Sequence, residues 1–302
     1  MIFLKEWLKK HDTLYFMLSN KRFVGGMIFI TVMVLLAVLG PWLAKIELSW
    51  YLKESGTKNL DPTANIGIPY SPPSSRHWLG TNSFGQDVFM QLVFGLRSSL
   101  LIGIIGGGLA TLIGLVIGFV SGYSGGMMDE LLMMLTNIML VIPTMAVLII
   151  IAAYLPYRGV LIESIIIGLT GWPWTARAVR SETLSLKSRD FVHLARISAV
   201  KPLRIIFGEI APNMLSYVFM VFILQFGGSI LAAVGLDFIG LGPTRGTSLG
   251  LMLQQAVLWN AIQLGMWWWI IPPGAIITAI VAALYTVNTG LDEAFNPKLR
   301  EM

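Results

Sequence analysis

The residues best suited to chemistry form a charged, amphipathic island at residues 188–213. Seven of the 21 lysines and arginines fall between Arg177 and Arg204, although charged residues make up only 12% of the chain and hydrophobic residues 55%. In a chain this apolar, such a segment must lie outside the lipid and face another surface. Its basic side chains and short apolar faces are suited to binding another surface.

The pattern of the island predicts a helix, a sharp turn and a second helix. Ser188 is the expected N-cap and Asp190 lies in the first turn, where an acid suits the helix dipole. Pro202 cannot continue a helix but suits the first position of a new one, and Pro212 opens the next apolar run. The apolar faces at helical spacing are expected to be Phe191, Leu194, Ala195 and Ser198 in the first helix, and Leu203, Ile206, Phe207 and Ile210 in the second.

Periodicity alone leaves three interpretations of the island open. It could lie on acidic lipid as an interfacial helix, dock to another protein, or be a solvated loop. In each case its cations face outward around the apolar faces. They are Arg189, Arg196, Lys201 and Arg204.

Energy for any transport has to reach this chain from outside. The phosphate-binding pattern GxxxxGK[ST] is absent, and the dipeptide Gly-Lys never occurs. The chain is therefore not expected to hydrolyse ATP by P-loop chemistry. The three histidines (His11, His77 and His193) are scattered and cysteine is absent, so we expect neither a metal site nor catalytic residues.

The island resembles the cytoplasmic coupling loop, the "EAA" loop, of binding-protein-dependent ABC importer permeases. That pattern, roughly E-A-A-x-x-x-G, nine residues, then I-x-L-P, aligns with His193, Leu194, Ala195, Ala199 and Pro212, and Ile210 lies one position after the Ile of the pattern. His193 replaces Glu, Leu194 an Ala, Ala199 the Gly, and Ala211 the Leu before Pro212. Because alanine tolerates a positive φ poorly, the turn at Ala199 is either αR-like or slightly strained.

Five further boxes, in order, resemble the dipeptide, oligopeptide and nickel permease subfamily. They are HWLGTN…GQD (77–87), GYSGG with DE (122–130), ARAVR (176–180), FIGLG (238–242) and DEAFNPKLR (292–300). The resemblance runs from about residue 77 to residue 300, and the order of the boxes makes it specific.

The fold class expected is an all-α integral membrane protein with six transmembrane helices. With mean hydropathy +0.74, the chain contains six apolar runs of about 20 residues, the length that crosses a bilayer. The resemblance implies a type I ABC importer transmembrane domain with cytoplasmic coupling helices and an external segment after helix 1. The runs are 24–44, 98–120, 130–153, 159–179, 214–235 and 269–289.

The basic residues predict the orientation and the domain order. Fourteen lysines and arginines lie on the side of the membrane that holds both termini and the island, and seven lie on the opposite side. Because basic residues favour the cytoplasmic side, both termini are expected to be cytoplasmic in a multi-pass plasma-membrane protein. The expected order is a cytoplasmic lead (1–23), the first helix (24–44), an extracytoplasmic segment (45–94), a five-helix transmembrane domain (95–291) with the coupling loop at about 183–212, and a cytoplasmic tail (292–302).

A few features inside the predicted spans have two interpretations each. Small residues four apart (Gly106, Ala110, Gly114, Gly118 and Gly122) could form a subunit contact or pack helices within the chain. Polar residues could line a pathway or join helices. The candidates for pathway lining are Asn137, Thr170, Gln225, Ser229 and Asn288. Pro143, Pro173 and Pro272–Pro273 should kink or delimit helices, Trp267–Trp269 should form an interfacial belt, and Glu163 should reach water.

The resemblance implies the second permease subunit of an importer for di- or oligopeptides, with oligosaccharides or nickel chelates as alternatives. The partners implied are another permease, two cytoplasmic ATPases that hold ATP and Mg, and an extracytoplasmic binding protein; no cofactor is expected in this chain. A self-powered secondary transporter is disfavoured by the lack of grouped ionisable residues in the spans. The residues implied in coupling are Arg189, Phe191, His193, Leu194, Ala195, Arg196, Ala199, Pro202, Ile210 and Pro212.

Overall fold

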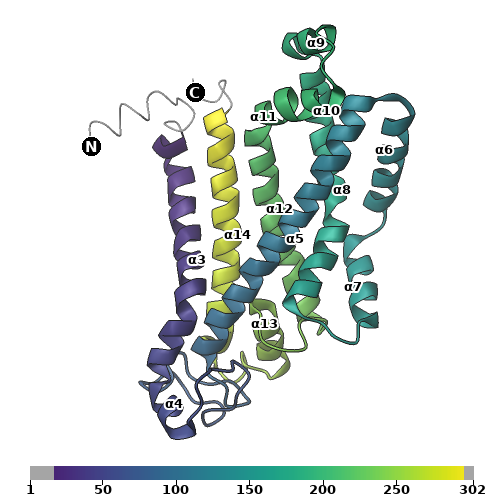
Figure 1. Ribbon diagram of the computed structural model, residues 1–302. Helices are drawn as coiled ribbons and strands as arrows, with labels where there is room; N and C mark the ends of the chain where they lie inside the picture. Colours follow the sequence, from purple (N-terminus) through teal and green to yellow (C-terminus); the bar gives the residue numbers. More distant parts are fainter. Residues whose placement is uncertain (1–16, 296–302) are drawn as a thin grey trace, which may run out of the picture.

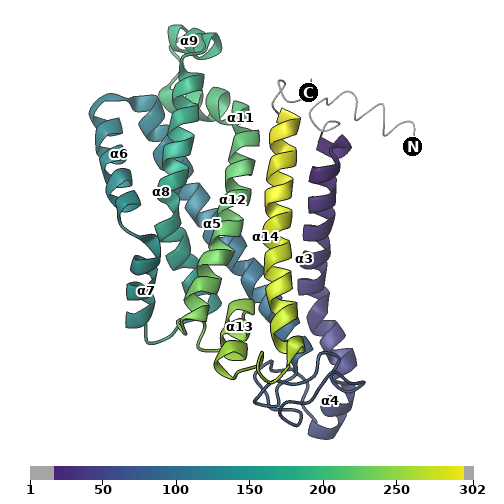
Figure 2. The same cartoon turned by 180° about the vertical axis from the view of Figure 1, so that it is seen from behind.

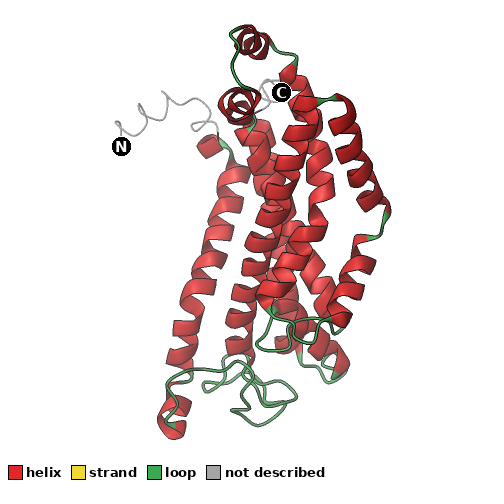
Figure 3. Cartoon of the chain, turned by 45° about the vertical axis from the view of Figure 1, so that its right-hand side comes forward, coloured by secondary structure: helices red, strands yellow, loops and turns green. Residues whose placement is uncertain are grey.

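The computed structural model describes residues 17–295, and every regular element in that range is a helix (Figure 3). The long helices run side by side between two ends of the molecule (Figure 1). At one end lie α9 (Asp190–Ile197), the start of α3 (Lys21–Glu47) and the end of α14 (Trp267–Phe295); at the other lie α4 (Ser49–Ser55) and the loop that follows it. We refer to these as the α9 end and the α4 end (Figure 2).

Four helices of the described range are long and apolar enough to cross a membrane: α3, α5 (Val88–Ser124), α12 (Leu215–Phe238) and α14. A fifth span is possible if α6 (Gly126–Val141) and α7 (Thr144–Tyr154) count as one, although they meet at 79°. Pro143 lies at this break, as the residue before α7, so the expectation that it delimits a helix is confirmed. α8 (Val160–Lys187) is long but less apolar, because it carries two tryptophans, a proline and a charged last third.

Several helices extend beyond the apolar runs that predicted them. α5 begins at Val88, ten residues before the predicted start, and α8 continues to Lys187, eight residues past the predicted end. Asp87 explains the early start of α5, since its carboxylate accepts a hydrogen bond from the Met90 amide at 2.7 Å as an N-cap. Polar residues end an apolar run without ending a helix, so the predicted boundary between residues 94 and 95 falls inside α5, and the one at residue 292 falls inside α14.

The prolines and tryptophans of the later helices lie differently from the positions that the sequence suggested. Pro272 and Pro273 lie inside α14, and Pro173 lies inside α8, so these three prolines do not delimit helices. Trp267 is exposed as a belt residue would be, but Trp268 and Trp269 are buried, and the Trp268 indole donates to the Thr81 carbonyl. The sequence also gave no signal for α13 (Leu249–Leu258), which is too short to span a membrane.

The ladder of small residues on α5 packs against α8 within this chain. A methyl group added at Gly114 would lie 2.4 Å from the Thr175 Cβ, and one at Gly118 2.7 Å from the Val179 Cβ. At Gly122 the nearest atom is the Thr183 Cβ, again at 2.7 Å. The two backbones therefore approach as closely as only glycine allows, which confirms helix packing within the subunit as the role of this face.

The loop at the α4 end is organised by the box at residues 77–87. His77 is buried, and its Nδ1 lies 2.7 Å from Asp87 Oδ2, so the residue that caps α5 also holds the loop. Asn82 accepts hydrogen bonds from the amides of Phe84 and Gln86, which closes the turn between them. The Trp78 amide donates to the Glu47 carboxylate at the end of α3. This box is therefore a structural clasp between α3, α5 and the loop.

Candidate coupling surface and pathway residues

The island at residues 188–213 folds into a chain of short helices at the α9 end. α9 is followed by α10 (Pro202–Ile205), a π-helical turn η1 (Ile206–Ile210) and α11 (Ala211–Asn213), which leads into α12. Pro202 is the first residue of α10, as expected. Ser188 is not the N-cap of α9: it ends α8, its hydroxyl donates to the Ser185 carbonyl, and Arg189 takes the N-cap position without a side-chain bond.

The turn after α9 has the hydrogen bonds of a Schellman motif, with alanine at the left-handed position. Ala199 has φ +56°, the Val200 amide donates to the Ala195 carbonyl at 3.1 Å, and the Ala199 amide donates to the Arg196 carbonyl at 3.0 Å. Glycine is the usual residue at this position, because a Cβ is strained at positive φ. Of the two alternatives that the sequence left open for this turn, the strained one is therefore observed.

The inner side of these helices is fixed to the membrane helices by an apolar cluster. Val192 of α9 is fully buried, with Ile205, Ile206 and Ile210 of the following turns. They pack with Phe119 of α5, Val179 of α8 and Met214 at the start of α12. Burying these side chains stabilises the contact by roughly 1.5–3 kcal/mol each before entropy losses, so α9 and the ends of α5, α8 and α12 form one mechanical unit.

The same segment also carries exposed apolar side chains together with basic ones. Leu194, Ile197, Leu203 and Phe207 are each more than 60% exposed. The cations of the segment are exposed, apart from half-buried Arg196; they are Arg189, Arg196, Lys201 and Arg204. We call these four apolar and four basic residues the docking patch.

The docking patch differs in membership from the faces that the sequence predicted. Leu194 is exposed, but Phe191 and Ala195 are half-buried against the apolar cluster, and His193 and Pro212 are exposed beside the patch. The second predicted face is divided: Leu203 and Phe207 point outward, whereas Ile206 and Ile210 are buried. The π-turn contributes to the division, since its i→i+5 hydrogen bonds place more residues in each turn and rotate the later ones out of α-helical phase. Ile197 had no assigned role in the sequence.

A second connection joins the start of α6 to α8 and α5. Arg180 donates two hydrogen bonds of 2.6 Å to the two oxygens of Asp129, and the Ser121 hydroxyl donates to the same carboxylate. Next to this pair, the charged groups of Arg196 and Lys187 lie over the ring of Tyr123, at 5.2 and 5.7 Å from its centre. The two boxes at residues 122–130 and 176–180, distant in sequence, thus meet and connect α9 to α6.

Four of the five candidate pathway residues lie among the helices. The Gln225 amide donates to the Gly171 carbonyl and the Thr175 hydroxyl, which joins α12 to α8. The Thr170 hydroxyl donates to carbonyls of its own helix, and Ser229 is buried beside Gly106. Asn288 has a buried Oδ1 without a hydrogen-bond partner. The contacts of Gln225 and Ser229 fit the role of joining helices, whereas the hydrogen bonds of Thr170 stay within α8.

Asn137 is different, because it is exposed on α6. Its Oδ1 accepts a hydrogen bond of 2.7 Å from Arg177 of α8. Together with methionines and aliphatic residues of α6 it lines an open groove of about 590 Å³. This face of α6 thus combines the hydrogen bond between Arg177 and Asn137 with a mostly apolar lining.

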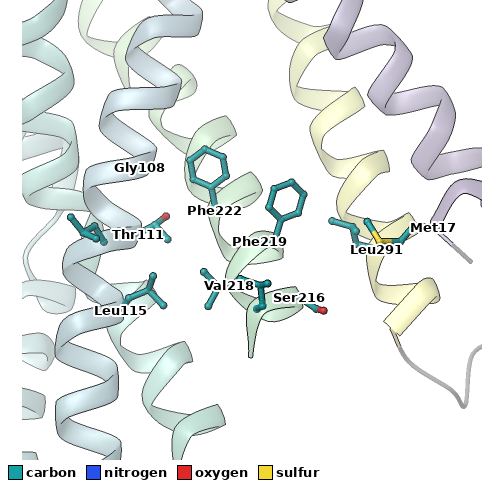
Figure 4. A pocket seen from close by; sticks show the side chains of 11 residues that line it. Met17, Gly108, Thr111, Leu115, Ser216, Val218, Phe219, Phe222 and Leu291 are labelled. Carbon is teal, nitrogen blue, oxygen red and sulfur yellow. The ribbon is translucent and has the colours of Figure 1, made fainter. Parts of the chain in front are cut away.

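A further pocket of about 550 Å³ lies between α5, α12 and α14 near the α9 end. Phe219 and Phe222 of α12 face Leu291 of α14 and Met17 across it (Figure 4). Its lining is apolar apart from Thr111 and Ser216. A pocket with so few polar groups suits hydrocarbon and offers little to a peptide backbone.

Of the stretches that match serine-nucleophile motifs by letter, two lie in the coupling region, and their structural context differs from that of a nucleophile. Residues 122–126 read GxSxG, yet Ser124 is the last residue of α5 and the turn connects two helices, not a strand and a helix. Residues 198–201 read SxxK, yet Ser198 is the C-cap of α9 and Lys201 precedes α10. These stretches are therefore turns of the coupling region.

A bundle whose described residues include four or five apolar helices able to cross a membrane is the architecture of a membrane protein of the permease class. Residues 114–301 match the family described as "binding-protein-dependent transport system inner membrane component", and residues 11–73 match the "N-terminal TM domain of oligopeptide transport permease C". The chain belongs to this family of binding-protein-dependent transport system inner membrane components.

The chain is similar to curated relatives over most of its length. It is 30% identical over 284 residues to the oligopeptide transport system permease protein OppC of Bacillus subtilis (strain 168), covering 94% of this chain and 88% of that protein. It is also 30% identical to the dipeptide transport system permease protein DppC of the same strain, over 93% and 83% of the two chains. With OppC of Mycobacterium tuberculosis (strain H37Rv) the identity is 33%, over 76% and 79%.

Proposed function

We propose that this protein is one of two permease subunits of an ATP-driven ABC importer for di- or oligopeptides. The observation that carries the proposal is the docking patch, an apolar and basic surface fixed rigidly to the ends of α5, α8 and α12. Family membership supports the transport role, and the names of the relatives support peptides as the cargo.

In this proposal the membrane contains six spans, with the α6–α7 pair as the third and α8 as the fourth. The α9 end faces the cytoplasm, because the island and both ends of the chain carry most of the basic residues. The α4 end then faces outward. The partners are a second, related permease, two cytoplasmic ATPases and a binding protein at the α4 end; ATP and Mg belong to the ATPases, and this chain is not itself an enzyme.

The geometry suits mechanical coupling. The docking patch would bind a cleft of the ATPase through Leu194, Ile197 and Leu203, with Arg189 and Lys201 at the rim. Closure of the ATPase pair would move α9, and the cluster around Val192 would pass this motion to α5, α8 and α12 together. The groove at Asn137 on α6 would line the pathway, opposite the same face of the second permease.

Substitution of Leu194 by aspartate tests the docking assignment. A carboxylate at the centre of the patch would be buried against the ATPase without a partner, at a cost of several kcal/mol. We expect the Leu194→Asp subunit to insert and assemble but to lose peptide-stimulated ATP hydrolysis and uptake in proteoliposomes. The matched control Leu194→Met keeps an apolar side chain at the same place and should retain both. Undiminished uptake by Leu194→Asp would refute the assignment.

The cargo is tested separately, by purifying the complete transporter with its binding protein and identifying the bound molecules by mass spectrometry. Di- or oligopeptides are expected. Oligosaccharides or a nickel chelate would keep the importer mechanism but change its substrate. Solute flux through this chain alone, without ATPases, would instead indicate a secondary transporter.

A further inference from the structure

Two acidic side chains at the α4 end are buried together, contrary to the expectation from the sequence. Glu163 in the first turn of α8 is 5% exposed, and Asp237 in the last turn of α12 is 1% exposed. They lie at the same junction, since Glu163 lines one small cavity with Leu236, the residue before Asp237, and with Leu241. Glu163 therefore does not reach water, and α8 and α12 do bring ionisable groups together, although they are 74 residues apart in sequence.

The hydrogen bonds around the pair assign different roles to the two acids. The Ser248 hydroxyl accepts from the Leu251 amide at 3.1 Å and donates to Asp237 Oδ2 at 2.5 Å, so Asp237 has a donor that suits a carboxylate. Glu163 has none: both of its oxygens are buried without a hydrogen-bond partner, as is Asp237 Oδ1. Leaving such groups unpaired is costly, and one hydrogen between the two acids would pair one Glu163 oxygen with Asp237 Oδ1, two of these three atoms.

The charges around the pair lead to the same conclusion. Arg158 lies in the connection between α7 and α8 and lines the cavity beside Glu163. Among the described residues around the two acids, it carries the charged group that faces them. Its Nε donates to the Gly242 carbonyl at 3.2 Å and its Nη1 to the Ala152 carbonyl at 3.4 Å, so its bonds go to backbone. Two ionised carboxylates beside one arginine leave one uncompensated negative charge in an apolar site, and one proton removes it.

The space next to Glu163 excludes larger ligands. The cavity that it lines with Arg158 and Leu241 is about 10 Å³, about the volume that a single water needs. On the other side, the chain backbone presses against Asp237: a Cβ at Gly242 would lie 2.2 Å from Oδ1, and one at Gly250 would lie 2.6 Å from Oδ2. A hydrated metal ion or the ammonium group of a peptide does not fit.

We propose that Glu163 and Asp237 form a proton-binding site that locks the α4 ends of α8 and α12 to the loop at residues 239–248. The proton lies on Glu163, whose hydroxyl donates to Asp237 Oδ1. The Thr244 amide, which donates to the Arg158 carbonyl at 2.7 Å, fastens the same loop to the start of α8. Loss of the proton leaves two adjacent carboxylates and loosens this junction. The proton-binding site can exist whatever this protein transports. Only the idea that the site controls access to the pathway rests on the proposed function.

Thermal stability against pH tests the site in the full-length chain in nanodiscs. Because the folded site keeps a proton that exposed carboxylates release, raising the pH from about 6 to about 9 should lower Tm. We expect a fall of at least about 3 °C for the wild type. Glu163→Gln, whose amide can donate to Asp237 without titrating, should lack this dependence. The control Glu130→Gln, at an exposed acid of α6, should keep it.

Two further measurements keep the proposal falsifiable if Glu163→Gln folds poorly. Infrared spectra of the folded wild type at a pH of about 6 should contain the band of a protonated carboxyl group, because the folded site keeps its proton there. A spectrum without this band at the lower pH, or a wild-type Tm independent of pH, would overturn the proposal. Replacing choline with sodium at constant ionic strength should leave Tm unchanged at the higher pH. A rise specific to sodium and absent in Glu163→Gln would identify a cation site in place of a proton site, and would also overturn it.

Discussion

Replacing Ala199 by glycine should stabilise the turn that ends α9, even though it removes a side-chain atom. Ala199 is held at φ +56° by the two hydrogen bonds of the Schellman motif. The left-handed conformation costs an alanine roughly 1–2 kcal/mol through the contact of its Cβ with the backbone. Glycine avoids this cost but loses about 0.5–1 kcal/mol more conformational entropy on folding. The net gain is therefore about 0.5–1 kcal/mol.

Hydrogen exchange of the Val200 amide measures this gain locally, because that amide bonds to the Ala195 carbonyl only while the turn is formed. A gain of about 0.5–1 kcal/mol should raise its protection roughly 2- to 5-fold. The matched control is Ala195→Gly, one turn earlier in α9, where the backbone is α-helical. There glycine should cost up to about 1 kcal/mol and lower the same protection.

The two substitutions are chemically identical and four residues apart, so opposite signs isolate the effect of the backbone conformation. If Ala199→Gly also lowers the protection of the Val200 amide, the turn is not strained in solution and Ala199 is αR-like there. This result would refute the inference that the chain tolerates backbone strain at Ala199, where the family pattern has glycine.

The remaining predictions concern packing, the connection to α6, and docking. Gly114→Val should destabilise the α5–α8 contact by about 1–3 kcal/mol, because its Cβ would lie 2.4 Å from the Thr175 Cβ, whereas Gly108→Ala, whose nearest neighbour is at 3.9 Å, should leave Tm of the purified chain within the error of the wild type. Asp129→Asn removes the charge that accepts both Arg180 hydrogen bonds and should cost about 1–2 kcal/mol, seen as faster hydrogen exchange at the start of α6; equal exchange in the variant would show that the pair contributes nothing. Ile197→Asp should uncouple uptake from ATP hydrolysis as Leu194→Asp does, although no sequence pattern assigned Ile197 a role, and normal coupling in this variant would remove it from the docking patch.

Much of the membrane architecture follows from local composition. A run of about 20 apolar residues has few alternatives to a spanning helix, because lipid offers no partner for an unpaired backbone amide. The helix at Pro202 and the break at Pro143 follow from the missing amide hydrogen and fixed φ of proline, and both are observed. The ordered boxes likewise determined the family, because they require particular side chains in a particular order.

The tertiary structure decided which side of each element faces outward and which distant residues meet. The π-turn at residues 206–210 separates residues that α-helical spacing would place together, so Phe207 is exposed and Ile206 is buried. The buried pair of Glu163 and Asp237 depends on how α8 crosses α12, and no local pattern contains that crossing. Hydropathy is a property of neighbours along the chain, whereas exposure and electrostatics depend on neighbours in space, and only the packed helices determine those.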